Sequence, residues 1–210
     1  MNKIVRELEK KLSKKTALLV IDVQNDYCSP SGALAKSGKP MQCIQEAAEK
    51  TIAVVEQARE ARVPIVFTRM DYDLEKIPAN NLERLKINKM EGLCAPGSWG
   101  AAFYKVRPKK GDRVVTKNFY DAFFRTDLGK WLEKKDVQTI LLCGVVTNIC
   151  PLLTAAEAYY RGYDLVAVND CLGAYEDQES ALHYMRQQFA ATVACSNEVI
   201  GVLKAVKQNT

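Results

Sequence analysis

Histidine is nearly absent from this sequence: His183 is the single one among 210 residues. Histidine is the side chain that most often acts as a general base and is a frequent ligand of catalytic metals. A histidine-rich metal centre is therefore excluded. A cysteine–histidine dyad would have to use His183, which falls in a helix predicted near residues 178–190. We expect carboxylates, lysines and cysteines to carry any acid–base chemistry.

Long apolar runs are absent as well, which excludes a membrane-spanning helix, and the first residues, MNKIVRELEKK, lack the apolar core of a signal peptide. Lysine and arginine outnumber aspartate and glutamate by 30 to 25, a net charge of +5, but the basic residues are dispersed. Dispersed charge is typical of solvated faces rather than of a nucleic-acid surface. We expect a soluble, cytoplasmic protein that binds neither membranes nor nucleic acids.

Paired cysteine motifs are also missing. The seven cysteines are odd in number and irregular in spacing, and none forms a Cys-x-x-Cys pair. A disulfide framework or a zinc knuckle is therefore not expected. Most free cysteines are buried as small apolar side chains, and Cys143, inside an apolar run, is the clearest example.

What the sequence does contain is a regular alternation of short apolar runs and helical segments, without repeats or linkers. Strands are predicted at residues 17–21, 63–68, 114–116, 139–143, 165–168 and 192–195. Helices are predicted within residues 1–15, at about 41–61 and 126–135, from Cys150 to about Gly162, and near 178–190. Apolar runs without polar alternation, separated by helices, are typical of a parallel sheet covered on both faces. We therefore predict one three-layer α/β domain over residues 1–210.

Three residues with useful chemistry follow three of these strands. Asp22 follows the first strand, Lys117 the third and Cys150 the fourth. Each has a plain structural explanation, as a turn cap, a solvated lysine or a buried thiol. However, ligands of such sheets bind beyond the carboxyl ends of the strands, and all three residues fall there.

Cys150 stands in the stretch GVVTNICP, between a strand and a helix that begins with Pro151. Proline suits the first turn of a helix. The helix N-terminus favours a thiolate, and its free N–H groups can stabilise an oxyanion. A nearby lysine is expected to lower the pKa of the thiol further, and an aspartate can accept and return its proton.

Four segments resemble the isochorismatase-like cysteine hydrolase superfamily: LLVIDVQNDY (18–27), PGSWG (96–100), GDRVVTKNFYDAFFRTDL (111–128) and LLCGVVTNICPLLTAAEAYYRGYDLVAVNDC (141–171). The resemblance implies a Rossmann-like sheet of six parallel strands and a catalytic triad of Asp22, Lys117 and Cys150. It also implies a cis peptide between Val145 and Val146 and an oxyanion hole made by the N–H groups of Val146 and Cys150. Members are usually homodimers or homotetramers.

Departures from relatives narrow the expected activity. The segment after the second strand, residues 68–73, lacks the histidine of the nicotinamidase metal site, and Cys150 separates the chain from isochorismatases that lack the cysteine. The remaining group resembles ureidoacrylate amidohydrolase, biuret hydrolase and N-carbamoylsarcosine amidohydrolase. We therefore expect a hydrolase without metal or cofactor. It would use water to cleave a C–N bond of a small amide, ureide or carbamoyl compound through a thioester, releasing ammonia. The alternatives are a nicotinamidase-type or larger-amide hydrolase, and an inactive oligomeric binding module.

The substrate pocket is expected to contain polar and aromatic side chains near these segments. Gln24 either donates to a substrate carbonyl or satisfies backbone groups, and Arg69 either binds a substrate carboxylate or faces solvent. The remaining pocket candidates are Trp99, Asn118, Phe119, Tyr120 and Phe123.

Overall fold

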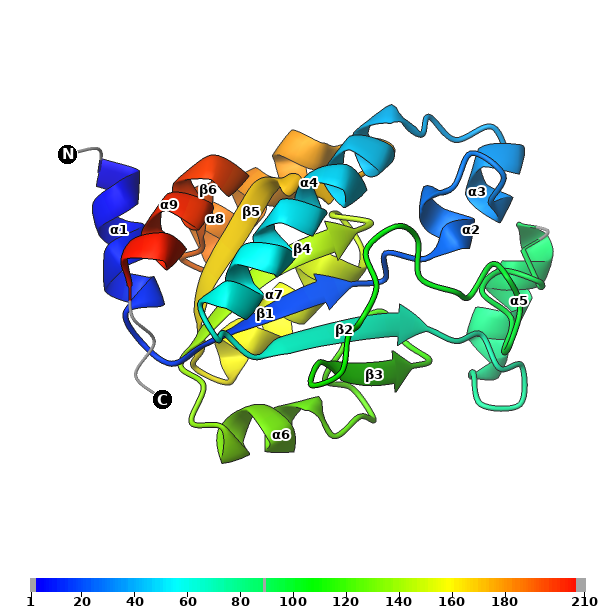
Figure 1. The fold of residues 1–210 in the computed structure, drawn as a ribbon. Helices are drawn as coiled ribbons and strands as arrows, with labels where there is room; N and C mark the ends of the chain where they lie inside the picture. The colour runs from blue at the N-terminus through cyan, green and yellow to red at the C-terminus, as the bar shows by residue number, and fades with distance from the viewer. Residues whose placement is uncertain (1–2, 89, 207–210) are drawn as a thin grey trace.

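The computed structural model describes residues 3–88 and 90–206. A sheet of six parallel strands forms its centre, in the order β3-β2-β1-β4-β5-β6 (Figure 1). The strands are β1 (Thr16–Ile21), β2 (Ile65–Met70), β3 (Arg113–Lys117), β4 (Thr139–Val145), β5 (Asp164–Gly173) and β6 (Thr192–Ala194). This is the order of doubly wound α/β folds, in which ligands bind where the direction of winding reverses, here between β1 and β4. The predicted Rossmann-like sheet is confirmed.

Burial explains why these runs form strands in this order. Every residue of β1 and β4 is buried, as expected for central strands covered on both faces. β3 at the edge of the sheet is only partly buried, and its Val114 is exposed. The pairing of Ile21 with Gly144 brings the ends of β1 and β4 into register.

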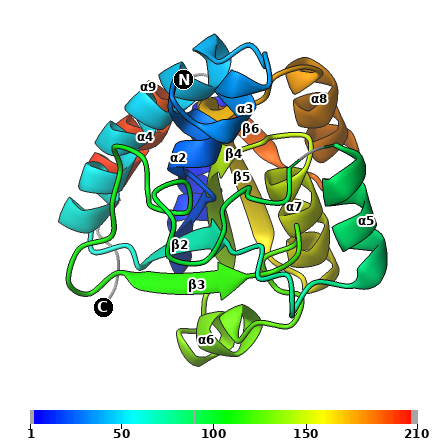
Figure 2. The same ribbon diagram turned by 90° about the vertical axis from the view of Figure 1, so that its right-hand side faces the viewer.

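Helices cover both faces of the sheet, which completes the predicted three layers. Figure 2 shows α4 (Gln42–Glu60) and α9 (Ser196–Ala205) on one side and α7 (Cys150–Tyr160) and α8 (Gln178–Gln188) on the other. α1 (Lys3–Leu12) contacts α9, and α6 (Leu128–Lys134) follows edge strand β3. None of the described helices is both long and apolar enough to cross a membrane.

The predicted helices are present, with slightly different ends. The helix expected within residues 1–15 is α1, and residues 1–2 lie outside the described part of the chain. Four further helices were not predicted: α2 (Asn25–Cys28), α3 (Ala33–Lys36), α5 (Ala79–Ile87) and α9. α2, α3 and α5 lie near the carboxyl ends of β1 and β2 (Figure 1), where they surround the expected site.

Candidate active site

Asp22 and Lys117 form a buried ion pair at the carboxyl ends of β1 and β3. Asp22 follows β1 directly, and Lys117, the last residue of β3, places its Nζ 2.6 Å from Oδ2 of Asp22. On the intervening strand β2, the Thr68 hydroxyl donates a hydrogen bond to Oδ1 of Asp22 at 2.7 Å. Lys117 Nζ also donates to the Phe119 carbonyl at 3.0 Å. The side chains of Lys117 and Asp22 are only 0% and 1% exposed, so each charge depends on the other for compensation.

Cys150 completes this group from the opposite side of the switch point. It is the first residue of α7, followed by Pro151. Its thiol interacts with the side chains of both Asp22 and Lys117. The structure thus brings together the three residues that were predicted from separate strand ends.

Burial sets the protonation states of the group. It raises the pKa of the Cys150 thiol above its ordinary value; Lys117 opposes this effect and Asp22 adds to it. The expectation of a lowered thiol pKa is therefore wrong for the site at rest. Burial alone would lower the pKa of Lys117, but Asp22 and Cys150 raise it above its ordinary value. At neutral pH the site holds a protonated lysine, its aspartate partner and a neutral thiol.

Residues 145–149 connect β4 to Cys150 at the start of α7. The peptide bond between Val145 and Val146 is cis. The N–H of Thr147 donates to the Gly173 carbonyl at 2.9 Å, and that of Ile149 donates to the Val146 carbonyl at 2.8 Å. Within the described residues, the N–H groups of Val146 and Cys150 donate no hydrogen bond. Both residues line a cavity.

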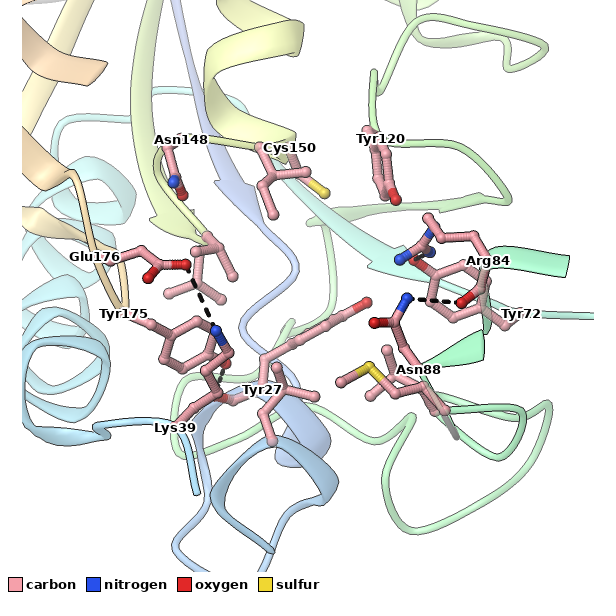
Figure 3. Close-up of a pocket in the computed structure, with 16 residues that line it drawn as sticks. Tyr27, Lys39, Tyr72, Arg84, Asn88, Tyr120, Asn148, Cys150, Tyr175 and Glu176 are labelled. Atoms are coloured by element: carbon pink, nitrogen blue, oxygen red, sulfur yellow. Dashed lines mark hydrogen bonds and ion pairs between the residues drawn. The ribbon is translucent and has the colours of Figure 1, made fainter. Parts of the chain in front are cut away.

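The cavity has a volume of about 220 Å³ and opens beside Cys150 (Figure 3). It is smaller than the roughly 300–1,000 Å³ of pockets that hold drug-sized ligands. Its wall combines tyrosines with a few polar and charged side chains. The labelled lining residues of Figure 3 are Tyr27, Lys39, Tyr72, Arg84, Asn88, Tyr120, Asn148, Cys150, Tyr175 and Glu176.

Of the pocket side chains predicted from sequence, Tyr120 lines this cavity. Gln24 does not, because its amide is used by the backbone. Its Nε2 donates to the carbonyls of Met70 and Ala101, each at 2.9 Å, and its Oε1 accepts from the Met70 N–H at 2.7 Å. The alternative in which Gln24 satisfies backbone groups is the one that the structure shows.

The remaining candidates are also placed outside the cavity. Arg69 is exposed and donates from Nε to the Thr116 hydroxyl at 3.0 Å, which holds it on the surface of the sheet edge. Trp99 is 56% exposed. Asn118 donates to the Asp71 carbonyl at 2.6 Å. The last two are aromatic and pack against other side chains: Phe119 against Phe124, with ring centroids 4.7 Å apart, and Phe123 against Tyr163, at 6.1 Å.

The sequence analysis missed most of the wall. Asn148 lay within the stretch already singled out, and its buried Oδ1 has no hydrogen-bond donor within the described residues. Arg84 and Asn88 come from α5 and its end, and no helix was predicted there. No group of three or more histidine, cysteine or acidic side chains that could hold a metal occurs in the part of the chain described.

The fold and these side chains define a class: a doubly wound α/β protein with an aspartate, a lysine and a cysteine gathered at the switch point of its sheet. The sequence model of the isochorismatase domain matches residues 16–198, and the chain belongs to the isochorismatase family of hydrolases.

Comparison with individual proteins agrees with this family. A ureidoacrylate amidohydrolase of Azorhizobium caulinodans is 28% identical over 171 residues, which cover 75% of each chain. A cysteine hydrolase of Pseudomonas syringae superposes with a TM-score of 0.81 at 26% identity, covering 91% of this chain and 93% of the other. An N-carbamoylsarcosine amidase of Thermoplasma acidophilum has a TM-score of 0.74 at 26% identity, and the match covers 87% of this chain and 97% of the other. A nicotinamidase of Bacillus subtilis has a TM-score of 0.71 at 26% identity, and the match covers 86% of this chain and 99% of the other.

Proposed function

We propose that this protein is a cysteine amidohydrolase that cleaves a C–N bond of a small amide, ureide or carbamoyl compound. One observation carries the proposal: a thiol at the wall of a small cavity contacts a buried Asp22–Lys117 pair whose charged atoms are 2.6 Å apart. A scaffold protein gains nothing from this arrangement, because burying an ion pair is costly in desolvation. The pair therefore argues against an inactive binding module.

The first step is a proton transfer within the buried group. Asp22 accepts the proton of the Cys150 thiol as the sulfur attacks the carbonyl carbon of the substrate. The negative charge moves from the carboxylate to the sulfur and then to the substrate oxygen, so the total charge of the group does not change. Lys117 keeps its proton and stabilises each of these anions in turn. A neutral resting thiol is thus compatible with nucleophilic attack, because its base is already in contact.

The second step breaks the C–N bond. The N–H groups of Val146 and Cys150 donate to the developing oxyanion. Protonated Asp22 returns its proton to the departing nitrogen, which leaves as ammonia, and the sulfur keeps the acyl or carbamoyl group as a thioester. Asn148, through its unpartnered Oδ1, accepts a hydrogen bond from the substrate amide N–H.

Water completes the reaction. Asp22 accepts a proton from a water molecule, whose oxygen attacks the thioester carbon, and the C–S bond breaks. The sulfur then recovers its proton from Asp22, which restores the resting state. The relatives named as ureidoacrylate amidohydrolase and N-carbamoylsarcosine amidase support an amide substrate, and the volume of about 220 Å³ favours a small amide over a large one.

Ammonia release from a panel of small amides tests this function. The panel contains biuret, N-carbamoyl amino acids, ureidoacrylate, maleamate, nicotinamide and simple aliphatic amides, each with and without EDTA. The Cys150→Ala variant should lose at least about 10³-fold in kcat/KM, as expected for residues that act as a unit. Cys43→Ser is the matched control, because Cys43 is an exposed free cysteine and should retain full activity. Activity retained by Cys150→Ala would overturn the proposal.

A further inference from the structure

We propose that the cavity beside Cys150 takes amides that carry a carboxylate, and that Arg84 is the side chain that binds this carboxylate. The inference rests on the proposed function, because it names the substrate class of the same site. Arg84 lies in the last turn of α5 and lines the cavity together with Cys150. A residue 66 positions away along the chain thereby lines the cavity of the proposed nucleophile.

The ionised side chains that line the cavity are unequally compensated. Lys39 and Glu176 form an ion pair with 3.5 Å between Nζ and Oε1. Arg84 forms no ion pair with any described residue. Beneath the cavity wall, Lys117 and Asp22 compensate each other. The cavity therefore carries one excess positive charge, which favours an anionic ligand.

The guanidinium of Arg84 is also held in place. Its Nε and Nη2 donate to Oδ1 of Asn81 at 3.1 and 3.0 Å, and its plane lies over the Tyr120 ring at 5.5 Å from the centroid. Nη1 donates no hydrogen bond within the described residues. A planar guanidinium that is already oriented, with donors to spare, is suited to binding a carboxylate.

Among the described residues, no acidic side chain lines this end of the cavity. Tyr27 and Tyr72 are neutral hydroxyls, since burial raises the pKa of each well above its ordinary value. Figure 3 shows Arg84 and Tyr120 on one side of Cys150, and Asn148 and Glu176 on the other. A substrate with its amide carbon at Cys150 would therefore direct its carboxylate toward α5, away from Glu176.

Binding to the Cys150→Ala variant tests this assignment without requiring turnover. The probes are N-carbamoylglycine, N-carbamoyl-β-alanine and N-carbamoyl-γ-aminobutyrate, each compared with its uncharged methyl ester by titration calorimetry. Within each pair the ester lacks the negative charge and adds one methyl group, and the series varies the distance from the amide to the carboxyl group. At least one acid should bind about 10-fold or more tightly than its ester, as expected for a charge-assisted hydrogen-bonded pair.

Substitutions at Arg84 then assign the preference. Arg84→Gln should reduce the acid-to-ester ratio of affinities to within about twofold. Arg84→Lys should give an intermediate ratio, because lysine keeps the positive charge but lacks the planar set of N–H donors of a guanidinium. Lys86→Gln is the matched control, since Lys86 is an exposed lysine of the same helix and should leave the ratio unchanged.

Equal affinity for acid and ester throughout the series, absence of binding included, would overturn the inference, as would a preference that survives in Arg84→Gln. Failure of the proposed chemistry has a different signature. In that case the acid preference and its loss in Arg84→Gln would persist in the binding experiment, while no member of the amide panel would release ammonia in a Cys150-dependent way.

Discussion

At the scale of single residues, the thiol of Cys150 shares a buried site with a carboxylate and an ammonium group. Ionising the thiol would add a second negative charge where one positive charge is already paired, and burial increases the cost of doing so. The resting thiol therefore keeps its proton, and in the proposed mechanism Asp22 acts as its base. This differs from an exposed reactive cysteine, in which a low pKa alone maintains the thiolate.

The pH dependence of alkylation should reveal this raised pKa. In a Cys43→Ser background, which removes the exposed cysteine, the rate of iodoacetamide modification at Cys150 should keep rising with pH from 6 to about 10, whereas an ordinary thiol with a pKa of about 8.5 levels off by then. A raised pKa means that little thiolate is present at neutral pH. Mass spectrometry of the peptide that contains Cys150 measures the rate separately from that of Cys195. A rate that reaches its plateau below pH 7 would contradict the neutral resting thiol.

Thr68 is expected to position Asp22 through its hydroxyl, which donates to Oδ1 at 2.7 Å and accepts from the Asp22 N–H at 3.2 Å. Thr68→Val preserves the shape of the side chain but leaves a buried carboxylate oxygen without its donor. The free energy of unfolding should fall by about 1–3 kcal/mol, and kcat should fall with it.

Thr68→Ser is the control for this substitution, because it keeps the hydroxyl and removes only a methyl group. Urea unfolding and steady-state kinetics of both variants distinguish the two contributions. If Thr68→Val keeps the kcat of Thr68→Ser, the hydrogen bond has no part in positioning the carboxylate.

The sequence predicted that Asp22, Lys117 and Cys150 lie together, but of the predicted pocket side chains only Tyr120 lines the cavity. Asp22, Lys117 and Cys150 could be placed together because parallel strands end at one edge of a sheet. No comparable rule predicts where the side chains of the connecting segments lie. Arg69 is exposed on β2, although it is only one residue from the strand end, while Arg84 reaches the cavity from a separate helix.

At the scale of elements, strands were easier to predict than helices. A strand buried on both faces is a continuous apolar run, and β1 and β4 are of this kind. α2 and α3 are four residues long, and α5 buries only Leu85 among its nine residues, so none has a clear apolar periodicity. These helices contribute Tyr27, Leu34 and Arg84 to the cavity wall, and most other lining residues belong to connecting segments, which have no regular pattern to predict from.

The junction of β1 and β4 at the site depends on Gly144. Its φ of +121° is unfavourable for other residues, and a Cβ there would lie 2.1 Å from the Ile21 carbonyl oxygen. Gly144→Ala should therefore lower the free energy of unfolding by roughly 2–5 kcal/mol through backbone strain and overpacking.

Gly201→Ala provides the matched comparison for the same chemical change. Gly201 lies inside α9, and a Cβ there would meet nothing within 4 Å. This variant should be neutral, or more stable by up to about 1 kcal/mol, since alanine favours helix. Chemical denaturation of both variants is the measurement. A Gly144→Ala protein as stable as the Gly201→Ala protein would contradict the close approach of the two strands.

At the scale of the whole molecule, the buried pair of Asp22 and Lys117 makes the stability of the fold depend on pH. The pKa of Lys117 is raised in the folded state, so folded protein holds this proton more tightly than the unfolded chain does. The resulting stabilisation is complete below the unfolded pKa of about 10.4 and is lost as the pH rises through the folded-state pKa. The assembly of the chain into a homodimer or homotetramer stays a prediction.

Urea unfolding between pH 9 and 11.5 measures this link. The wild-type protein should lose more stability over this range than the double variant Asp22→Asn/Lys117→Met, which lacks the titrating pair. Buried tyrosines and Cys150 also destabilise the fold as they ionise, and those coupled to Asp22 or Lys117 form part of the difference between the two proteins. Identical pH dependence in the two proteins would show that the pair contributes nothing to alkaline stability.

In the proposed function, Cys150 forms a covalent intermediate with the carbonyl carbon of a small amide. Rapid acid quenching during turnover of an amide that releases ammonia, followed by intact-mass and peptide analysis, tests it most directly. We expect an adduct of the acyl or carbamoyl mass on Cys150 that is absent from Cys150→Ser. Ammonia release that continues in Cys150→Ser would contradict it.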